Sequence, residues 1–283
     1  MAAAMAPAAV AARARGAVLG CLIGDAAGTP MHWVYDPAKL AEHMKVVTRG
    51  PAFAEPPGNT FYNPGPGSFS CYGDQTMALL ESLVSSGGRF DVEDYSNRVA
   101  EKFGKSSRYE VDAVDAENWP ALKKDMTMPL NGPWRHGSIK GFLKNYTLEG
   151  KRFPDCGSED GQVDGVCKVA PIVALLAGQA NMLEVVDQAV RVTQNNDDAA
   201  GFACAFARVL ERLVLGASAS PAEACAAVGA ELADPGRPFK TVRDDVVAAG
   251  LSRLSAEFAG LSHEDVGLKL KPEAATFPFA GLA

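Results

Sequence analysis

The feature that most constrains the fold is a series of helix-length segments in which apolar residues recur at every third or fourth position. This spacing places the apolar side chains on one face of a helix. The segments lie at residues 182–193, 197–215 and 242–258, and a continuously apolar helix is expected over residues 167–177. No run of alternating apolar and polar residues argues for β-strands, and no repeat period is visible. The pattern therefore predicts an all-α fold.

Residues typical of helix ends bound several of these segments. Asp74 and Asp91 each open an amphipathic segment, where an aspartate can accept hydrogen bonds from the free N–H groups of a first helical turn. Ser220, with Pro221 after it and Glu223 three positions on, has the form of a capping box. These signals favour helix starts at all three places.

Four glycines near the amino terminus recur every four residues, at Gly16, Gly20, Gly24 and Gly28. Residues four apart are neighbours on a helix surface. Because a glycine stripe lets another backbone approach closely, the sequence predicts a buried, tightly packed helix over residues 10–24.

Two long loops interrupt the helical pattern. Residues 50–73 are rich in Pro, Gly and Asn, and residues 157–165 form an acidic, glycine-containing tract. Residues 105–166, which include the second loop, are irregular, so we expect only short helical pieces there. Long loops in compact domains are more often functional than idle, which makes these segments candidates for a site.

Composition limits the classes of partner. The chain has 27 basic and 34 acidic residues, a net charge of -7, and no basic stripe, so nucleic acid is a poor expectation. No apolar run approaches the roughly 20 residues that span a bilayer, so no membrane partner is expected. The six cysteines show no zinc spacing and favour a reducing cytoplasmic location.

The domain organisation is expected to be simple. Residues 1–15 form an Ala-rich extension, which is a weak candidate for organelle targeting, and residues 16–283 form a single domain.

Several stretches together resemble the ADP-ribosylglycohydrolase family. They are GAVLGCLIGDAAGTPMHW (16–33), YGDQTMALLESL (72–83), VAPIVALLAG (169–178), the helix start VTQNNDD (192–198) and FPFAGLA (277–283). The resemblance implies a multi-helix orthogonal bundle whose cleft holds one or two Mg²⁺ ions. Family members cleave the glycosidic bond that joins ADP-ribose to a protein side chain or a small acceptor.

Two further stretches look most like the branch of J1-crystallins and selenoprotein J. They are the string HWVYD (32–36) and WRHGSIKGF (134–142). Some members of that branch are structural proteins of the lens. This likeness keeps a second interpretation open, a non-catalytic relative that binds ADP-ribose or serves as a crystallin-like structural protein.

The resemblance places a metal site at the start of the second stretch. Where the family has two adjacent acids flanked by threonines, this chain has Gly73, Asp74, Gln75 and Thr76. Mg²⁺ prefers oxygen ligands, so Asp74, Thr76 and the amide of Gln75 are the expected ligands, with weaker binding than two acids would give. The family's second metal motif is not found, and the chain is expected to be truncated relative to the family, so we expect at most one ion.

The expected catalytic residues are His32 and Asp25. His32 stands where many family members carry a glutamate, and an imidazole can serve as a general base near neutral pH. Asp25 follows the glycine-striped segment and is expected to contact water or ribose in the cleft. Each also has a plain structural interpretation, His32 as a hydrogen-bonded neighbour of Trp33 and Asp25 as an acceptor for loop N–H groups.

The expected substrate-binding residues come from the acidic loop and the next helix start. Asp160 and Asp164 precede Lys168, which occupies a position that is often arginine in the family. Asn195 opens residues 195–198, where free N–H groups of a helix start attract anions such as a diphosphate. Simple solvation or capping is the alternative for these residues.

Three other side chains also have two interpretations. Trp119 and Trp134 can stack on adenine, although packing in a core is the more common use of tryptophan. Cys71, just before the metal-like turn, can have a lowered pKa if it lies at a helix start.

Taken together, the resemblance and its candidate residues predict a Mg²⁺-dependent hydrolase of an ADP-ribosyl glycosidic bond. Its expected substrate is an ADP-ribosylated protein or a small ADP-ribose conjugate.

Overall fold

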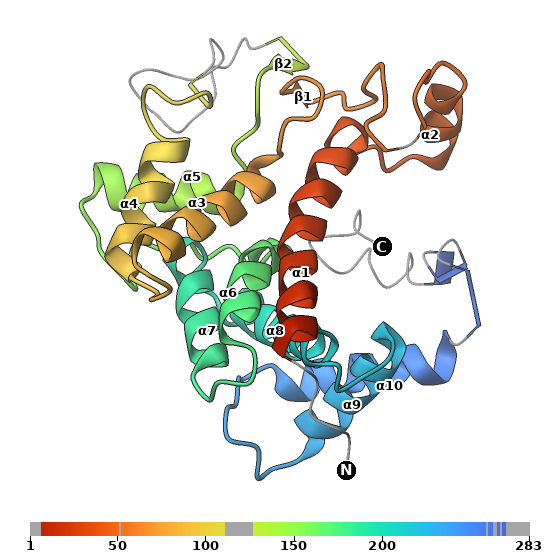
Figure 1. Cartoon of the computed structure of the whole chain (residues 1–283). Helices are drawn as coiled ribbons and strands as arrows, with labels where there is room; N and C mark the ends of the chain where they lie inside the picture. Colours follow the sequence, from red (N-terminus) through yellow and green to blue (C-terminus); the bar gives the residue numbers. More distant parts are fainter. Residues whose placement is uncertain are drawn as a thin grey trace.

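Helices make up nearly all the regular structure of the chain (Figure 1). The computed structural model describes residues 7–50, 52–110, 127–258, 260–262, 265–266 and 268–269. The α-helices are α1 (Pro7–Gly28), α2 (Pro37–Met44), α3 (Cys71–Ser85), α4 (Val92–Phe103), α5 (Gly137–Leu143), α6 (Val169–Leu176), α7 (Met182–Thr193), α8 (Asp197–Leu215), α9 (Pro221–Ala233) and α10 (Asp244–Glu257). The predicted all-α class is confirmed.

Short elements complete the architecture. Two 3₁₀ turns, η1 (Thr29–Met31) and η3 (Val163–Lys168), and one π-helical turn, η2 (Lys144–Leu148), lie between the α-helices. The strands β1 (Tyr62–Asn63) and β2 (Leu130–Asn131) form one parallel pair. The sequence did not predict these three elements, because the strands are only two residues long and α2 is a short helix that buries none of its residues.

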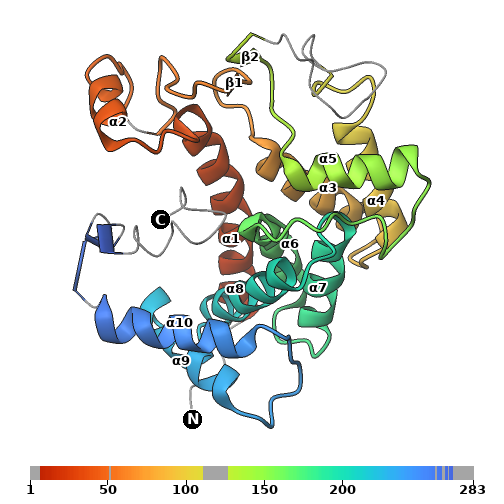
Figure 2. The ribbon, with the colours of Figure 1, turned by 180° about the vertical axis from the view of Figure 1, so that it is seen from behind.

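The core lies where α3, α4, α6, α7 and α8 pack together (Figure 2). Each contributes apolar side chains with no exposed surface, among them Leu79, Val99, Ile172, Val186 and Ala203. The predicted bounds of α7 and α8 are those observed. Apolar periodicity located these helices because their inward faces are buried along their whole length.

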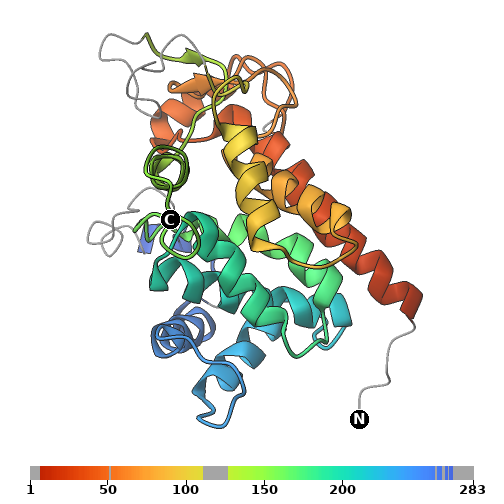
Figure 3. The same ribbon diagram turned by 90° about the vertical axis from the view of Figure 1, so that its left-hand side faces the viewer.

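The helix α1 differs from its prediction. One side of it contacts α3, α6 and α8, but the helix runs along the outside of the bundle (Figure 3). A Cβ atom added at Gly16, Gly20, Gly24 or Gly28 would meet nothing within 4 Å. The expectation of a tightly packed glycine face over residues 10–24 is therefore wrong for the described part of the chain.

The same helix bears on the membrane expectation. By length and composition the stretch Pro7–Met31 is sufficient to cross a membrane, although such a helix near an amino terminus is weak evidence for one. The expectation that the chain has no segment long and apolar enough to span a bilayer is therefore wrong. The helix also begins at Pro7, so the expected boundary at residue 15 falls inside α1.

Of the three predicted helix caps, two are confirmed and one is corrected. Asp91 accepts hydrogen bonds from Glu93 N and Asp94 N at the start of α4, and Ser220 caps α9, so both predicted caps are confirmed. At α3 the cap is Ser70, whose hydroxyl accepts from Tyr72 N. This helix starts one turn earlier than predicted, which places Asp74 inside its first turn.

Candidate functional site

A pocket of about 440 Å³ opens between α1 and α8 and reaches η3; we call it the α1–α8 pocket. Its walls are mainly apolar, and its lining also includes four polar side chains, His32, Tyr72, Gln162 and Asp164. A mainly apolar pocket with a few polar groups is the usual form of a small-molecule site. The sequence predicted His32 as a catalytic residue and Asp164 as a substrate-binding residue, and the structure brings both to this pocket.

His32 follows η1 and is packed among aromatic rings. Its Nδ1 lies 2.8 Å from the hydroxyl of Tyr62, and its ring centroid lies 4.8 Å from that of Trp33 and 5.4 Å from that of Tyr72. Burial, together with the nearby charge of His136, lowers the pKa of His32 to about 4. The imidazole is therefore neutral at pH 7.

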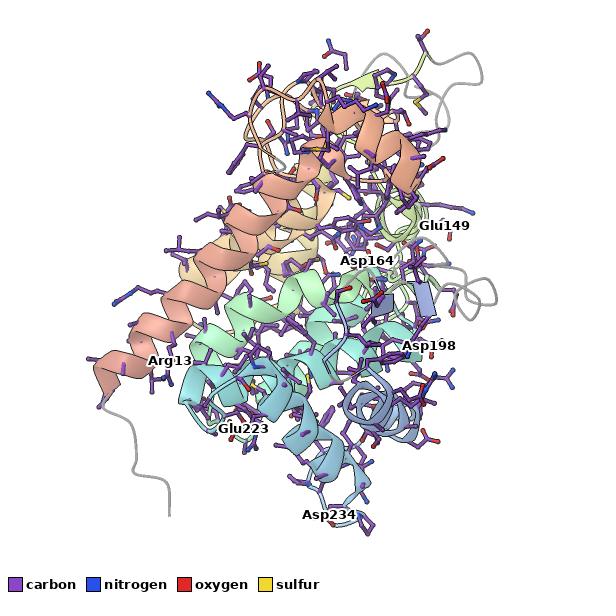
Figure 4. The ribbon with its side chains drawn as sticks, turned by 90° about the vertical axis from the view of Figure 1, so that its right-hand side faces the viewer. Arg13, Glu149, Asp164, Asp198, Glu223 and Asp234 are labelled. Carbon is purple, nitrogen blue, oxygen red and sulfur yellow. The ribbon has the colours of Figure 1, made fainter. Side chains whose placement is uncertain are left out.

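Asp164 lies in η3, and Figure 4 shows it in the middle of the molecule. Its Oδ2 is 3.0 Å from Nε2 of His136, and its Oδ1 accepts a hydrogen bond of 2.9 Å from Nε2 of Gln194. The buried ammonium of Lys168 in turn donates to Oε1 of Gln194 at 3.4 Å. Asp164 and Lys168, both expected to bind substrate, are thus linked through Gln194.

Gln75 extends this arrangement toward α3. Its Nε2 lies 2.8 Å from Nε2 of His136. Four side chains therefore surround Asp164 in one hydrogen-bonded set, which we call the Asp164 network: Gln75, His136, Lys168 and Gln194. All four are buried, so the network fixes the orientation of the Asp164 carboxylate.

Asp25 occupies a notch at the start of α3. Its carboxylate accepts hydrogen bonds from the amide of Ser70, at 2.9 Å, and from the Ser70 hydroxyl. A Cβ atom at Gly73 would collide with this carboxylate. Burial raises the pKa of Asp25, although the bonds from Ser70 oppose the shift. The contacts are those of the loop-capping interpretation, and Asp25 is not among the residues that line the α1–α8 pocket.

Asp74 is held by two residues that follow α4. Oδ2 accepts hydrogen bonds from the guanidinium of Arg108, with Nε at 3.2 Å, and from the hydroxyl of Tyr109 at 2.6 Å. The side chain of Asp74 is 8% exposed. This carboxylate therefore already has a cationic partner.

The other two expected metal ligands point elsewhere. The Thr76 hydroxyl lies 2.7 Å from the carbonyl oxygen of Cys167 and 3.1 Å from that of Tyr72. Gln75 contacts His136, and its buried Oε1 has no hydrogen-bond partner among the described residues. In that part of the chain no group of three or more histidine, cysteine and acidic side chains could hold a metal ion. The side chains of residues 74–76 contact three different partners, and this arrangement does not fit one divalent ion shared among them. The magnesium dependence of the protein stays a prediction from the family resemblance.

The other two predicted substrate-binding residues, Asp160 and Asn195, are not among the residues that line the α1–α8 pocket. Oδ1 of Asp160 accepts from the amide of Gln162, and burial raises the pKa of Asp160. Asn195 accepts from Arg191 and lines a separate polar pocket of about 380 Å³ at the start of α8, where Figure 4 labels Asp198. Asn195 is therefore separated from the pocket that holds His32 and Asp164.

The less favoured candidates for functional residues are two tryptophans and Cys71. Trp134 packs edge-on against Trp33, with centroids 5.5 Å apart, and lies under the ammonium of Lys140. Trp119 and residues 277–283 lie outside the described part of the chain. Cys71 is buried at the start of α3, and burial raises its pKa well above the ordinary value. The lowered pKa expected for a reactive thiol is therefore wrong.

Several residues of the site were not predicted as functional. His136 joins Gln75 to Asp164, while Arg108 and Tyr109 engage Asp74. His136 is one of only four histidines, which is a usable signal in retrospect. For Arg108, no local pattern indicates a partner 34 positions away in the sequence.

Comparison of the sequence with known proteins identifies one family. The profile described as ADP-ribosylglycohydrolase matches residues 6–278. Crystallin J1B and Crystallin J1A of Tripedalia cystophora are 33% and 32% identical over 203 residues, or 72% of this chain. The chain spans 58% of the length of these two relatives. A solved "ADP-ribosylglycohydrolase-related protein complex" is 18% identical with a TM-score of 0.49, covering 87% of this chain and 76% of that one.

Proposed function

Because this chain belongs to the ADP-ribosylglycohydrolase family, we propose that the α1–α8 pocket binds an ADP-ribosyl group and that the protein hydrolyses the glycosidic bond to it. The observation that carries the proposal is the meeting of His32 and Asp164 at this pocket. One offers a proton acceptor, and the other offers a fixed negative charge. Glycosidic cleavage needs both functions.

Asp164 has the role of stabilising positive charge. During cleavage the sugar acquires oxocarbenium character, which a nearby carboxylate stabilises. The hydrogen bond from Gln194 to Oδ1 and the contact of His136 Nε2 with Oδ2 hold this carboxylate in place before the reaction. A charge that is oriented in advance requires no reorganisation when the transition state forms, which is the main advantage of such a group.

His32 has the role of accepting a proton from the attacking water. When Nδ1 carries the hydrogen that faces Tyr62, the lone pair of Nε2 is available as a base. A conjugate acid with a pKa of about 4 makes this base weak, because general bases work best when their pKa is near the working pH. We therefore expect slow turnover.

The proposed substrate is an ADP-ribosylated protein or a small ADP-ribose conjugate. The apolar walls from α1 and α8 suit an aromatic base or the apolar part of an acceptor. Magnesium dependence stays a prediction from the family resemblance. No step proposed here passes through the ion, because Asp74, Gln75 and Thr76 contact different partners.

A second candidate function is that of a non-catalytic relative. Two observations favour it: the relatives found by similarity are crystallins, and Gln75 and His32 replace acids of the family pattern. Such a protein keeps the helical frame, because the frame depends on apolar packing and caps. It binds ADP-ribose without turnover, or serves only as a structural protein.

The test is release of ADP-ribose from ADP-ribosyl-arginine peptide, ADP-ribosyl-serine peptide and acetylated ADP-ribose. Asp164→Asn and His32→Ala should each abolish release. Asp234→Asn, at an exposed position after α9, is the matched control and should leave it unchanged. Binding of ADP-ribose in a calorimeter without release from any substrate would replace the first proposal by the second.

A further inference from the structure

We infer that the guanidinium of Arg108 is the resident cation of the Asp74 site, so that this carboxylate takes no divalent ion. The inference concerns cation binding alone. It holds whether or not the protein hydrolyses an ADP-ribosyl bond, because cation binding is measured without substrate.

The contacts at Asp74 are those of an occupied site. Nε and Nη2 of Arg108 and the hydroxyl of Tyr109 all donate to the same oxygen, Oδ2. Hydrogen bonds between charged groups are shorter and stronger than neutral ones. A metal ion at Oδ2 would have to displace both Arg108 and Tyr109.

Arg108 is itself held on two sides. Its Nη2 also donates to the carbonyl oxygen of Phe69 at 3.1 Å, and its guanidinium carbon lies 5.5 Å from the ring centroid of Tyr109. The Tyr109 ring is buried and packs on Phe103, with centroids 4.6 Å apart. The cation is thus fixed by the loop before α3 and by the segment after α4.

The charges explain why a divalent ion is excluded. Mg²⁺ and Mn²⁺ are attracted to sites with net negative charge and several oxygen ligands. Arg108 neutralises Asp74, and the adjacent Gln75 supplies no charge. A divalent ion at Asp74 would also lie beside the guanidinium, and like charges at this distance repel.

The pair differs from an ordinary surface ion pair. The Arg108 side chain is 42% exposed, but that of Asp74 is only 8% exposed, and it also accepts from the buried Tyr109. The pair of Arg98 and Asp94 within α4 has both side chains about one third exposed and serves as the comparison. Removing Arg108 leaves a nearly buried carboxylate with a single donor and an unneutralised charge, which is a site for another cation.

The experiment is a titration with Mn²⁺, followed by electron paramagnetic resonance of the free ion, on the full chain. The wild-type protein and the control Arg98→Gln should show no Mn²⁺ binding that depends on Asp74, whereas the Mn²⁺ affinity of Arg108→Gln should exceed the weak, non-specific affinity of the wild type by about tenfold or more. Adding Asp74→Asn to Arg108→Gln should abolish that gain. Arg108→Lys keeps the charge and should show no gain.

Two results of the titration overturn the inference. One is Mn²⁺ binding by the wild type that matches Arg108→Gln and is lost in Asp74→Asn, since the ion would then displace Arg108. The other is a folded Arg108→Gln with no gain. If Arg108→Gln does not fold, thermal unfolding of the wild type with and without Mn²⁺ decides. The inference requires the unfolding temperature to be the same, and a rise that Asp74→Asn removes refutes it.

Discussion

The fit between Gly73 and Asp25 leads to a prediction with an unusual sign. Replacing glycine by alanine inside a helix normally stabilises a protein by about 0.4–1 kcal/mol, because alanine has less conformational freedom in the unfolded chain. Gly73 lies in α3, so helix propensity alone predicts a gain for Gly73→Ala. The structure predicts a loss.

The magnitude follows from the atoms around Gly73. A Cβ there would lie 2.8 Å from Cγ of Asp25 and 2.9 Å from Cβ of Phe69, both far inside ordinary contact. Overpacking of this kind costs about 1–3 kcal/mol. Moving Asp25 aside also weakens its bonds from Ser70, and a hydrogen bond to a charged group contributes about 1.5–3 kcal/mol. After the helix-propensity gain is subtracted, we expect a net destabilisation of about 1.5–5.5 kcal/mol.

Chemical denaturation followed by circular dichroism measures this difference. The matched control is Gly20→Ala in α1, where an added Cβ meets nothing within 4 Å and a stabilisation of about 0.5–1 kcal/mol is expected. In Asp25→Ala the position of the carboxylate is open, so Gly73→Ala should cost much less in that background. A Gly73→Ala protein as stable as the wild type would refute the reasoning.

Three further predictions concern single side chains. His32 has a pKa of about 4 when folded against about 6.5 when unfolded, so its neutral form favours the folded state above pH 6.5 and stability is lost as pH falls from 6.5 to 4. Denaturation curves across that range should show His32→Gln losing less stability than the wild type, by at most about 3 kcal/mol; identical curves would contradict the shift. Thr76→Val should cost about 1–3 kcal/mol in urea denaturation because the buried Cys167 carbonyl loses a donor, whereas Thr48→Val at an exposed position should change little, and equal costs would remove the argument. Iodoacetamide at pH 7 should leave Cys71 unmodified in the folded protein, because the thiol is buried with a raised pKa; a labelled Cys71 peptide in mass spectra would show otherwise.

The sequence predicted best those parts of the fold that depend on local patterns. The bounds of α7 and α8 and the caps Asp91 and Ser220 follow from apolar periodicity and from hydrogen bonds within one turn. The glycine stripe of α1 was misjudged because spacing shows which residues share a face but not whether another element covers that face.

The site was predictable only in part. The sequence identified His32 and Asp164 through the family resemblance, and the structure places both at one pocket. The partners of Asp74 were missed because Arg108 and Tyr109 reach it from a separate segment, so the contact depends on tertiary packing. A capping role and a ligand role require the same residue types at a helix start, and only the three-dimensional partners separate them.

The Asp164 network connects segments that are distant along the chain. Gln75, His136, Asp164 and Gln194 come from α3, the start of α5, η3 and the end of α7. Opening any one of these segments alone would strand buried polar groups on the others, at a cost of about 1–3 kcal/mol for each. Partial opening is therefore penalised, and the backbone amides of these four segments should exchange with deuterium only when the whole bundle unfolds.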